Sequence, residues 1–124
     1  MSAAIIKRMR EQRMQWVELD DGKKVRIIRP SAVDVGEHLV HTGSVRVEHA
    51  HIVMFATDWQ GFTEADLLGA AIGSSDPLAF DKDLWAEYSC DRTEVCAKVS
   101  AAILTALVEH HKTADADEKN SPPG

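Results

Sequence analysis

The sequence predicts a single domain of the α+β class, mainly α, with an amino-terminal β-hairpin, a small bundle of four to five helices and a disordered carboxy-terminal tail. The 124 residues, 44% of them apolar and 27% charged, suit one ordinary domain with its own core. A turn sequence near the amino end separates two short segments of alternating polarity, and helix start and stop signals recur after it. We therefore expect a folded domain over residues 1–112, with the hairpin at about 15–29 and helices at about 32–112, and a flexible tail at 113–124.

The hairpin is placed by Asp20-Asp21-Gly22, which suits a three-residue loop with Gly22 in the left-handed conformation. Such a loop pairs Leu19 with Lys23 and fixes the rest of the register. One face then gathers four apolar side chains: Val17, Leu19, Val25 and Ile27. The other face receives two cross-strand pairs: Glu18 opposite Lys24, and Trp16 beside Arg26 in reach of a cation–π contact. Two strands alone are marginal in water, so helices or another chain must cover the apolar face.

Two helices are expected after Pro30, which closes the second strand. Ser31 and Asp34 have the spacing of a capping box, which predicts a helix over about 32–41 that ends near Gly43. Helical spacing of apolar residues predicts a second helix over about 44–60. Because this segment is rich in β-branched residues, a strand over Ile52 to Ala56 remains an alternative.

Three shorter signals predict the remaining helices. Thr63 and Asp66 repeat the capping pattern and predict one or two helical turns before Gly69. Asp81 is expected to cap a short helix, and Asp91 with Glu94 is expected to open the last one. The last helix carries a continuous apolar stripe: Val95, Val99, Ala102, Ile103, Ala106 and Leu107.

No arrangement of residues predicts catalysis or cofactor binding. The six histidines lack the spacing of a zinc site, and Cys90 and Cys96 are read as reduced thiols. Four carboxylates cluster in the sequence, but at positions that suit helix amino termini: Asp81, Asp83, Glu87 and Asp91. There is no Gly-x-Ser-x-Gly elbow and no phosphate-binding loop. We expect neither an enzyme nor a metal or cofactor site.

Charge is distributed unevenly along the chain. Residues 1–30 hold eight Lys or Arg against four Asp or Glu, whereas residues 31–124 hold six against sixteen. The acidic body argues against a nucleic-acid-binding regulator, which needs a continuous basic face. No apolar run approaches the roughly 18 residues of a membrane span and no signal peptide is recognisable, which predicts a soluble cytoplasmic protein without a membrane partner.

Aromatic residues in a domain of this size usually belong to the core. The corner between Trp59 and Phe62 follows a predicted helix end and, if it stays accessible, would suit an amphipathic helix of another protein. The predicted partner-binding residues are Phe55, Trp59, Phe62, Leu67 and Leu68.

This corner begins a string of motifs: Trp59-x-Gly61-x-Thr63-Glu64-Ala65-Asp66-Leu67-Leu68-Gly69, then Asp76-Pro77, Phe80-Asp81 and Asp91-Arg92. Together with Trp16-Val17-x-Leu19 and Arg29-Pro30, the string resembles the tail assembly chaperones of long-tailed, siphophage-type bacteriophages over about residues 13–120. The two cysteines and the His-rich segment 38–51 are not features of that family and leave the binding face undefined.

The resemblance implies a non-enzymatic chaperone that acts in the host cytoplasm and is absent from the mature virion. Such a protein binds the long tape measure protein, keeps it soluble and helps bring tail tube subunits to it. A homo-oligomer is expected, and no cofactor.

Glu118-Lys119-Asn120 can be encoded as GAA AAA AAC, which contains a slippery run for a ribosomal frameshift. Many members of this family exist in a short and a frameshifted longer form, so this tripeptide fits the same interpretation. The alternative hypothesis is a small structural tail protein, such as a terminator or connector, that remains in the virion.

Overall fold

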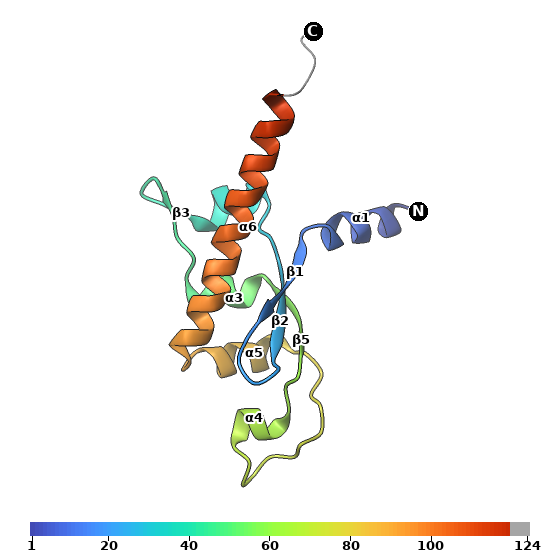
Figure 1. Cartoon of the computed structure of the whole chain (residues 1–124), viewed down its shortest axis with the longest axis vertical. Helices are drawn as coiled ribbons and strands as arrows, with labels where there is room; N and C mark the ends of the chain where they lie inside the picture. Colours follow the sequence, from blue (N-terminus) through green and yellow to red (C-terminus); the bar gives the residue numbers. More distant parts are fainter. Residues whose placement is uncertain (120–124) are drawn as a thin grey trace.

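The computed structural model describes the backbone of residues 1–119 and the side chains of residues 1–114. The chain forms a mixed α and β fold around a three-stranded antiparallel sheet (Figure 1). The strands are β1 (Met14–Glu18), β2 (Lys24–Ile28) and β5 (Ala56–Gln60), in the order β1-β2-β5, with a separate ribbon of β3 (Val40–His41) and β4 (Ser44–Val45). The helices are α1 (Ser2–Glu11), α2 (Ala32–Asp34), the π-helical turn η1 (Val35–Leu39), α3 (His49–Met54), α4 (Glu64–Leu68), α5 (Lys82–Ser89) and α6 (Thr93–Lys119).

The hairpin of β1 and β2 confirms the predicted register. Val17 pairs with Val25 and Glu18 pairs with Lys24, while the Leu19 N–H donates to the Lys23 carbonyl at 2.8 Å. Gly22 has a φ of +74°, the left-handed conformation that the loop requires. On the outer face, the Trp16 ring lies 5.0 Å from the Lys24 ammonium and 5.7 Å from the Arg26 guanidinium, as cation–π contacts.

The predicted helix over 44–60 is confirmed only in the middle, where α3 spans His49–Met54, and is wrong at both ends; the alternative strand over Ile52 to Ala56 is wrong, because most of that segment is helical. The chain forms β4, a short α3 and then β5, which pairs antiparallel with β2. The reason is the free edge of β2, whose unpaired backbone groups need a partner. The Ile28 N–H donates to the Phe55 carbonyl at 2.9 Å, and the pairing continues with Val25 opposite Trp59.

The predicted helix over 32–41 is shorter than expected. The capping box at Ser31 and Asp34 is confirmed, but α2 passes into the π-helical turn η1 and ends at Leu39. A tight turn with positive φ at Thr42 and Gly43 then joins β3 to β4.

The later helices follow the prediction more closely. The Thr63 and Asp66 capping box opens α4, and the Asp81 carboxylate accepts two backbone N–H bonds at the start of α5. In α6, the stripe residues Val95, Val99 and Ile103 are buried. This helix continues to Lys119, past the expected end at residue 112, so the first part of the expected tail is helical; residues 120–124, including Asn120 of the slippery tripeptide, lie outside the described residues.

The core lies between one face of the sheet and the helices α3, α5 and α6, which contact one another. The helices therefore do not form the expected bundle on their own, because the sheet supplies one wall of the core. The buried hydrophobic side chains are Val17, Leu19, Val25, Ile27, Leu39, Ile52, Phe55, Ala56, Trp59, Phe62, Trp85, Tyr88, Val95, Val99 and Ile103.

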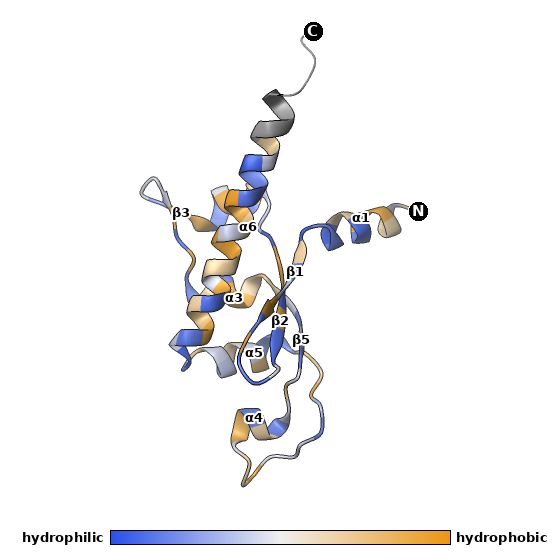
Figure 2. Cartoon of the chain, viewed as in Figure 1, coloured by the Kyte–Doolittle hydropathy of each residue, from blue (hydrophilic) through white to orange (hydrophobic). Residues whose placement is uncertain are grey.

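Helix α1 was not predicted and extends away from the rest of the chain (Figure 1). It buries none of its residues and combines hydrophobic with strongly hydrophilic residues along its length (Figure 2). Ile5, Ile6 and Met9 are all exposed, beside Lys7 and Arg10. Within the described residues, no helix combines the length and the hydropathy that crossing a bilayer requires.

Candidate partner-binding groove

The docking corner predicted at Trp59 and Phe62 is wrong, because both side chains belong to the core. Trp59 is 4% exposed and Phe62 is 1% exposed, and their rings stack with centroids 4.3 Å apart. The Trp59 indole N–H donates to the Leu78 carbonyl at 2.8 Å, so its polar atom is satisfied inside the protein. Phe55 is also buried and Leu67 is partly buried against the core, which leaves only Leu68 exposed among the five predicted residues.

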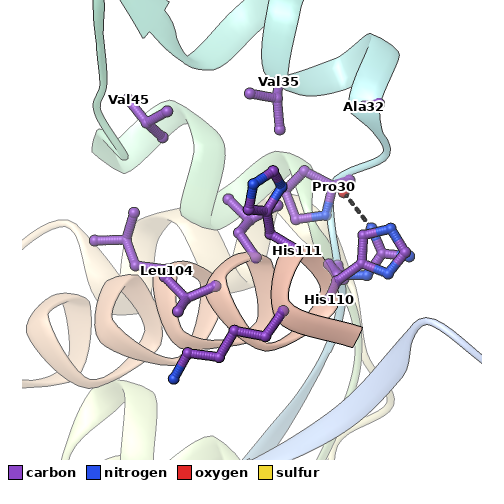
Figure 3. Close-up of a pocket in the computed structure, with 11 residues that line it drawn as sticks. Pro30, Ala32, Val35, Val45, Leu104, His110 and His111 are labelled. Atoms are coloured by element: carbon purple, nitrogen blue, oxygen red, sulfur yellow. Dashed lines mark hydrogen bonds between the residues drawn. The ribbon is translucent and has the colours of Figure 1, made fainter. Parts of the chain in front are cut away.

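A different surface offers an open apolar groove of about 580 Å³. It lies between the second half of α6 on one side and η1 and the β3–β4 ribbon on the other (Figure 3). Figure 3 shows Val35 and Val45 facing Leu104 and His111 of α6, with Pro30 at one end. The residues that line the groove are Arg29, Pro30, Ala32, Val35, Val45, Leu104, Leu107, Val108, His110, His111 and Lys112.

The groove is formed by a second apolar face of α6. Leu104, Leu107, Val108 and His111 occupy positions i, i+3, i+4 and i+7 of the helix, so they project on the same side. Leu104 is 37% exposed and Val108 is 52% exposed, whereas Val99 and Ile103 on the neighbouring face are fully buried. The predicted stripe omitted Leu104 and Val108. Their presence makes the apolar face wider than one packing interface needs, and that excess width was the signal available in the sequence.

The capping box at the start of α2 fixes the wall of the groove opposite α6. The Ser31 N–H donates to Asp34 Oδ2 at 2.9 Å, and the Asp34 N–H donates to Ser31 Oγ at 3.1 Å. The hydrogen bond from the Ser31 backbone is the main reason why the pKa of Asp34 lies below its usual value, and burial opposes it. Pro30 directly precedes the capping residue Ser31. It is fully buried and lies at the bottom of one end of the groove.

The rim of the groove is basic. Arg29 and Lys112 line it, together with His110 and His111. A second hollow of about 560 Å³ adjoins this end and shares Arg29, Ala32 and His110 with the groove. Met9, Gln12 and Arg13 continue that hollow toward α1. The apolar surface therefore ends at a positively charged corner where α1 meets the body of the protein.

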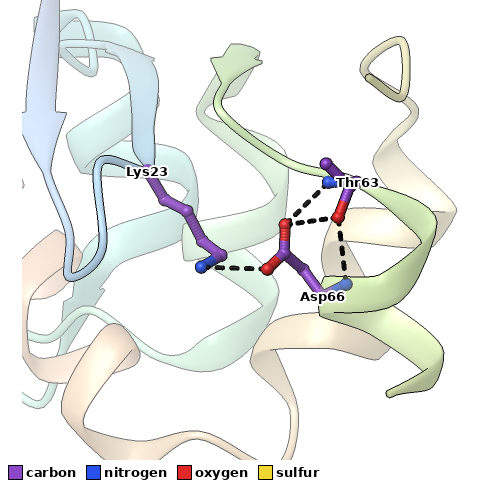
Figure 4. A network of polar contacts seen from close by, with 3 residues as sticks. All are labelled: Lys23, Thr63 and Asp66. Carbon is purple, nitrogen blue, oxygen red and sulfur yellow. Dashed lines mark hydrogen bonds and ion pairs between the residues drawn. The ribbon is translucent and has the colours of Figure 1, made fainter. Parts of the chain in front are cut away.

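A polar cluster around Asp66 joins the hairpin to α4 (Figure 4). Lys23 Nζ lies 3.1 Å from Asp66 Oδ1, while the Thr63 N–H and hydroxyl donate to Asp66 Oδ2 at 2.8 and 2.9 Å. Burial alone would raise the pKa of Asp66, but the hydrogen bonds from Thr63 and Lys23 outweigh it and the pKa is lowered. Because every group is paired within the cluster, we assign it a structural role.

The cysteines and histidines do not form a metal site in the described part of the chain, where no three His, Cys, Asp or Glu side chains are grouped to hold an ion. The Cys90 thiol donates to the Glu87 carbonyl and the Cys96 thiol to the Ser89 carbonyl, both at 3.1 Å. His49 Nε2 lies 2.9 Å from the hydroxyl of the buried Ser89, which in turn donates to the Trp85 carbonyl at 2.7 Å. These contacts tie α3, α5 and the start of α6 together.

Comparison with protein-family models, with curated proteins and with solved structures found no match.

Proposed function

We propose that this protein is a phage tail assembly chaperone that binds the tape measure protein through the groove beside α6. In this proposal it acts in the host cytoplasm, keeps the tape measure protein soluble, helps recruit tail tube subunits and is absent from the mature virion. The observation that carries the proposal is an open groove with a nearly continuous apolar lining between α6 and the η1–β4 segment. Grooves of this kind receive the apolar face of an amphipathic helix, and a tape measure protein is largely helical.

The size of the groove limits how strongly one copy can bind. Two or three large apolar side chains of a client helix, at about 1.5–3 kcal/mol each, offer roughly 3–9 kcal/mol before any cost of association. Association and side-chain ordering oppose this by several kcal/mol, so a single groove holds its client weakly. Weak binding suits a chaperone that must release the client when the tail tube forms around it. A homo-oligomer placed along a rod-like client would recover affinity through multivalency.

Co-expression with the tape measure protein of the encoding phage or prophage tests the proposal. The tape measure protein should remain soluble and co-purify with the wild-type chain. Val108→Asp and Leu104→Asp should abolish retention, because each places a charge on the apolar lining without removing a core side chain. Ile72→Asp is the matched control, since Ile72 is 76% exposed and lies outside the groove lining.

Separate elution of the wild-type chain and the tape measure protein would contradict the proposal, as would equal loss in the Ile72 control. Mass spectrometry of purified virions provides an independent check. A chaperone should be missing from them, whereas stoichiometric amounts of this chain in the particle would favour a structural tail protein.

A further inference from the structure

Two arginines meet where the groove adjoins α1. Arg29 lines both the groove and the adjoining hollow, and Arg13 lines the hollow. The two residues are joined through their backbones, because the Arg29 N–H donates to the Arg13 carbonyl at 2.7 Å. Their guanidinium groups are close enough for the charge of Arg13, after the larger effect of burial, to lower the pKa of Arg29.

This pair has no carboxylate partner among the described side chains. Arg13 Nη1 donates to the Arg29 carbonyl at 3.3 Å, and Arg29 Nη1 donates to the Pro30 carbonyl at 3.0 Å. Neither side chain takes part in an ion pair within the described part of the chain. Asp34 lies close enough to Arg13 for the guanidinium charge to contribute to its lowered pKa, but the Asp34 carboxylate is held by the capping box with Ser31.

Each guanidinium carries five N–H donors in a planar fork that matches a carboxylate, so most of the donors of this pair remain available. Two partly buried like charges beside an apolar surface repel each other, and an anion from a partner would relieve that repulsion. Lys112, which also lines the groove, is instead near a carboxylate of its own chain, with Nζ 4.0 Å from Glu109 Oε1. Among the described side chains, the positive charge without a carboxylate partner therefore lies at the α1 end of the groove.

We propose that the groove binds an amphipathic helix that carries a Glu or Asp at the end lying over Arg13 and Arg29. The apolar face of the helix occupies the lining from Val45 to Pro30, and the carboxylate contacts the two guanidinium groups. This fixes which way the client helix runs along α6. The inference rests on the proposed function in one respect, that the groove is the client site, and it adds the chemistry and direction of the client segment.

The two ends of a second copy of this chain are poor occupants. Helix α1 has exposed apolar residues, but Lys7, Arg8 and Arg10 would bring further positive charge to the basic rim. The end of α6 is acidic in sequence, but over residues 113–119 its only apolar residues are alanines, which offer little area to the groove. A separate acidic, amphipathic client fits both the lining and the rim.

Synthetic helical peptides test this without relying on any variant of the protein. Three peptides share one apolar face of three leucines and differ by a Glu at the first turn, a Glu at the last turn, or Gln at both. Fluorescence anisotropy should show one of the two Glu peptides binding the full chain about 10- to 100-fold more tightly than the Gln peptide. The other Glu peptide should bind like the Gln peptide, and added salt should weaken only the preferred one.

Substitutions in the protein then locate the interaction. Arg29→Gln and Arg13→Gln should each reduce the advantage of the preferred Glu peptide, while affinity for the Gln peptide stays the same. Lys7→Gln removes one charge from α1 outside the groove lining and should change nothing. Circular dichroism confirms that each variant is folded.

Equal affinities of the three peptides would overturn this inference and leave the groove as a client site. Binding of none of them would count against both the inference and the groove as the client site. The assignment to the arginine pair would also be refuted if Lys7→Gln reduced the affinity advantage of the preferred Glu peptide as much as Arg29→Gln does.

Discussion

Gly61 joins β5 to α4 and combines a left-handed backbone with a close approach to the hairpin loop, so a single methyl group there should disturb the fold. Its φ is +82°, and a Cβ built there would lie 2.5 Å from the Gly22 carbonyl oxygen and 3.2 Å from Lys23 Cα. Both contacts are with backbone atoms of the hairpin loop, which cannot rotate away. A left-handed conformation costs a residue with a side chain about 1–2 kcal/mol, and displacing packed backbone adds about 1–3 kcal/mol. The reduced entropy of the unfolded chain returns about 0.4–1 kcal/mol.

Gly61→Ala should therefore lower the free energy of unfolding by about 2–4 kcal/mol, measured as a lower denaturant midpoint at unchanged slope. Two glycines serve as controls because a Cβ at either meets nothing within 4 Å. Gly43→Ala, at a φ of +85°, isolates backbone strain and should cost about 1 kcal/mol. Gly36→Ala has no such strain and should be stabilising by about 0.4–1 kcal/mol. If Gly61→Ala and Gly43→Ala lose the same stability, the close approach of Gly61 to the hairpin loop is not real.

Three further predictions concern the polar cluster, the core and the two cysteines. Asp66→Asn should lower the free energy of unfolding by about 1–2 kcal/mol in chemical denaturation. Because the pKa of Asp66 is lowered in the folded protein, its carboxylate stabilises the fold above pH about 4, and this stabilisation is lost as the pH falls through the folded pKa. An acid-denaturation profile of the variant identical to that of the wild type would contradict this. Trp59→Phe should lower the free energy of unfolding by about 1–3 kcal/mol, because it leaves the Leu78 carbonyl without the indole donor in a partly buried setting, and an unchanged melting temperature would count against that hydrogen bond. In the native protein, the exposed Cys90 should react with a maleimide well before Cys96. The Cys96 thiol is partly buried, and burial raises its pKa, so equal reaction rates of the two cysteines would refute this order.

Features fixed by neighbouring residues could be predicted from the sequence. The loop at Gly22 sets the register of the hairpin by itself, since its conformation determines which residues face each other. The capping boxes at Ser31 and Thr63 depend on side chains three residues apart, and both are present. These elements need no knowledge of what packs against them.

Features fixed by distant parts of the chain were missed. Ala56–Gln60 has both helical spacing and β-branched neighbours, and the free edge of β2, thirty residues earlier in the chain, decides the outcome. The same pairing carries Trp59 into the core, where it stacks on Phe62, so an exposed corner was predicted where none exists. A local sequence pattern cannot show whether an aromatic residue will point to the core or to solvent when pairing with a distant strand decides its orientation.

Because the groove lies on the second face of α6, its role in binding can be tested by mutation without loss of stability. The predicted corner at Trp59 and Phe62 would not allow such a test. On α6, Val99 and Ile103 are fully buried, whereas Leu104 and Val108 line the groove and remain accessible. A charge placed at Val108 therefore reaches solvent in the free protein and meets the client only when the groove is occupied. At Trp59 the same substitution would unfold the core, and loss of binding would carry no information about the site. A binding surface built from the second face of a helix whose first face holds the core can thus be altered by mutation while the fold persists.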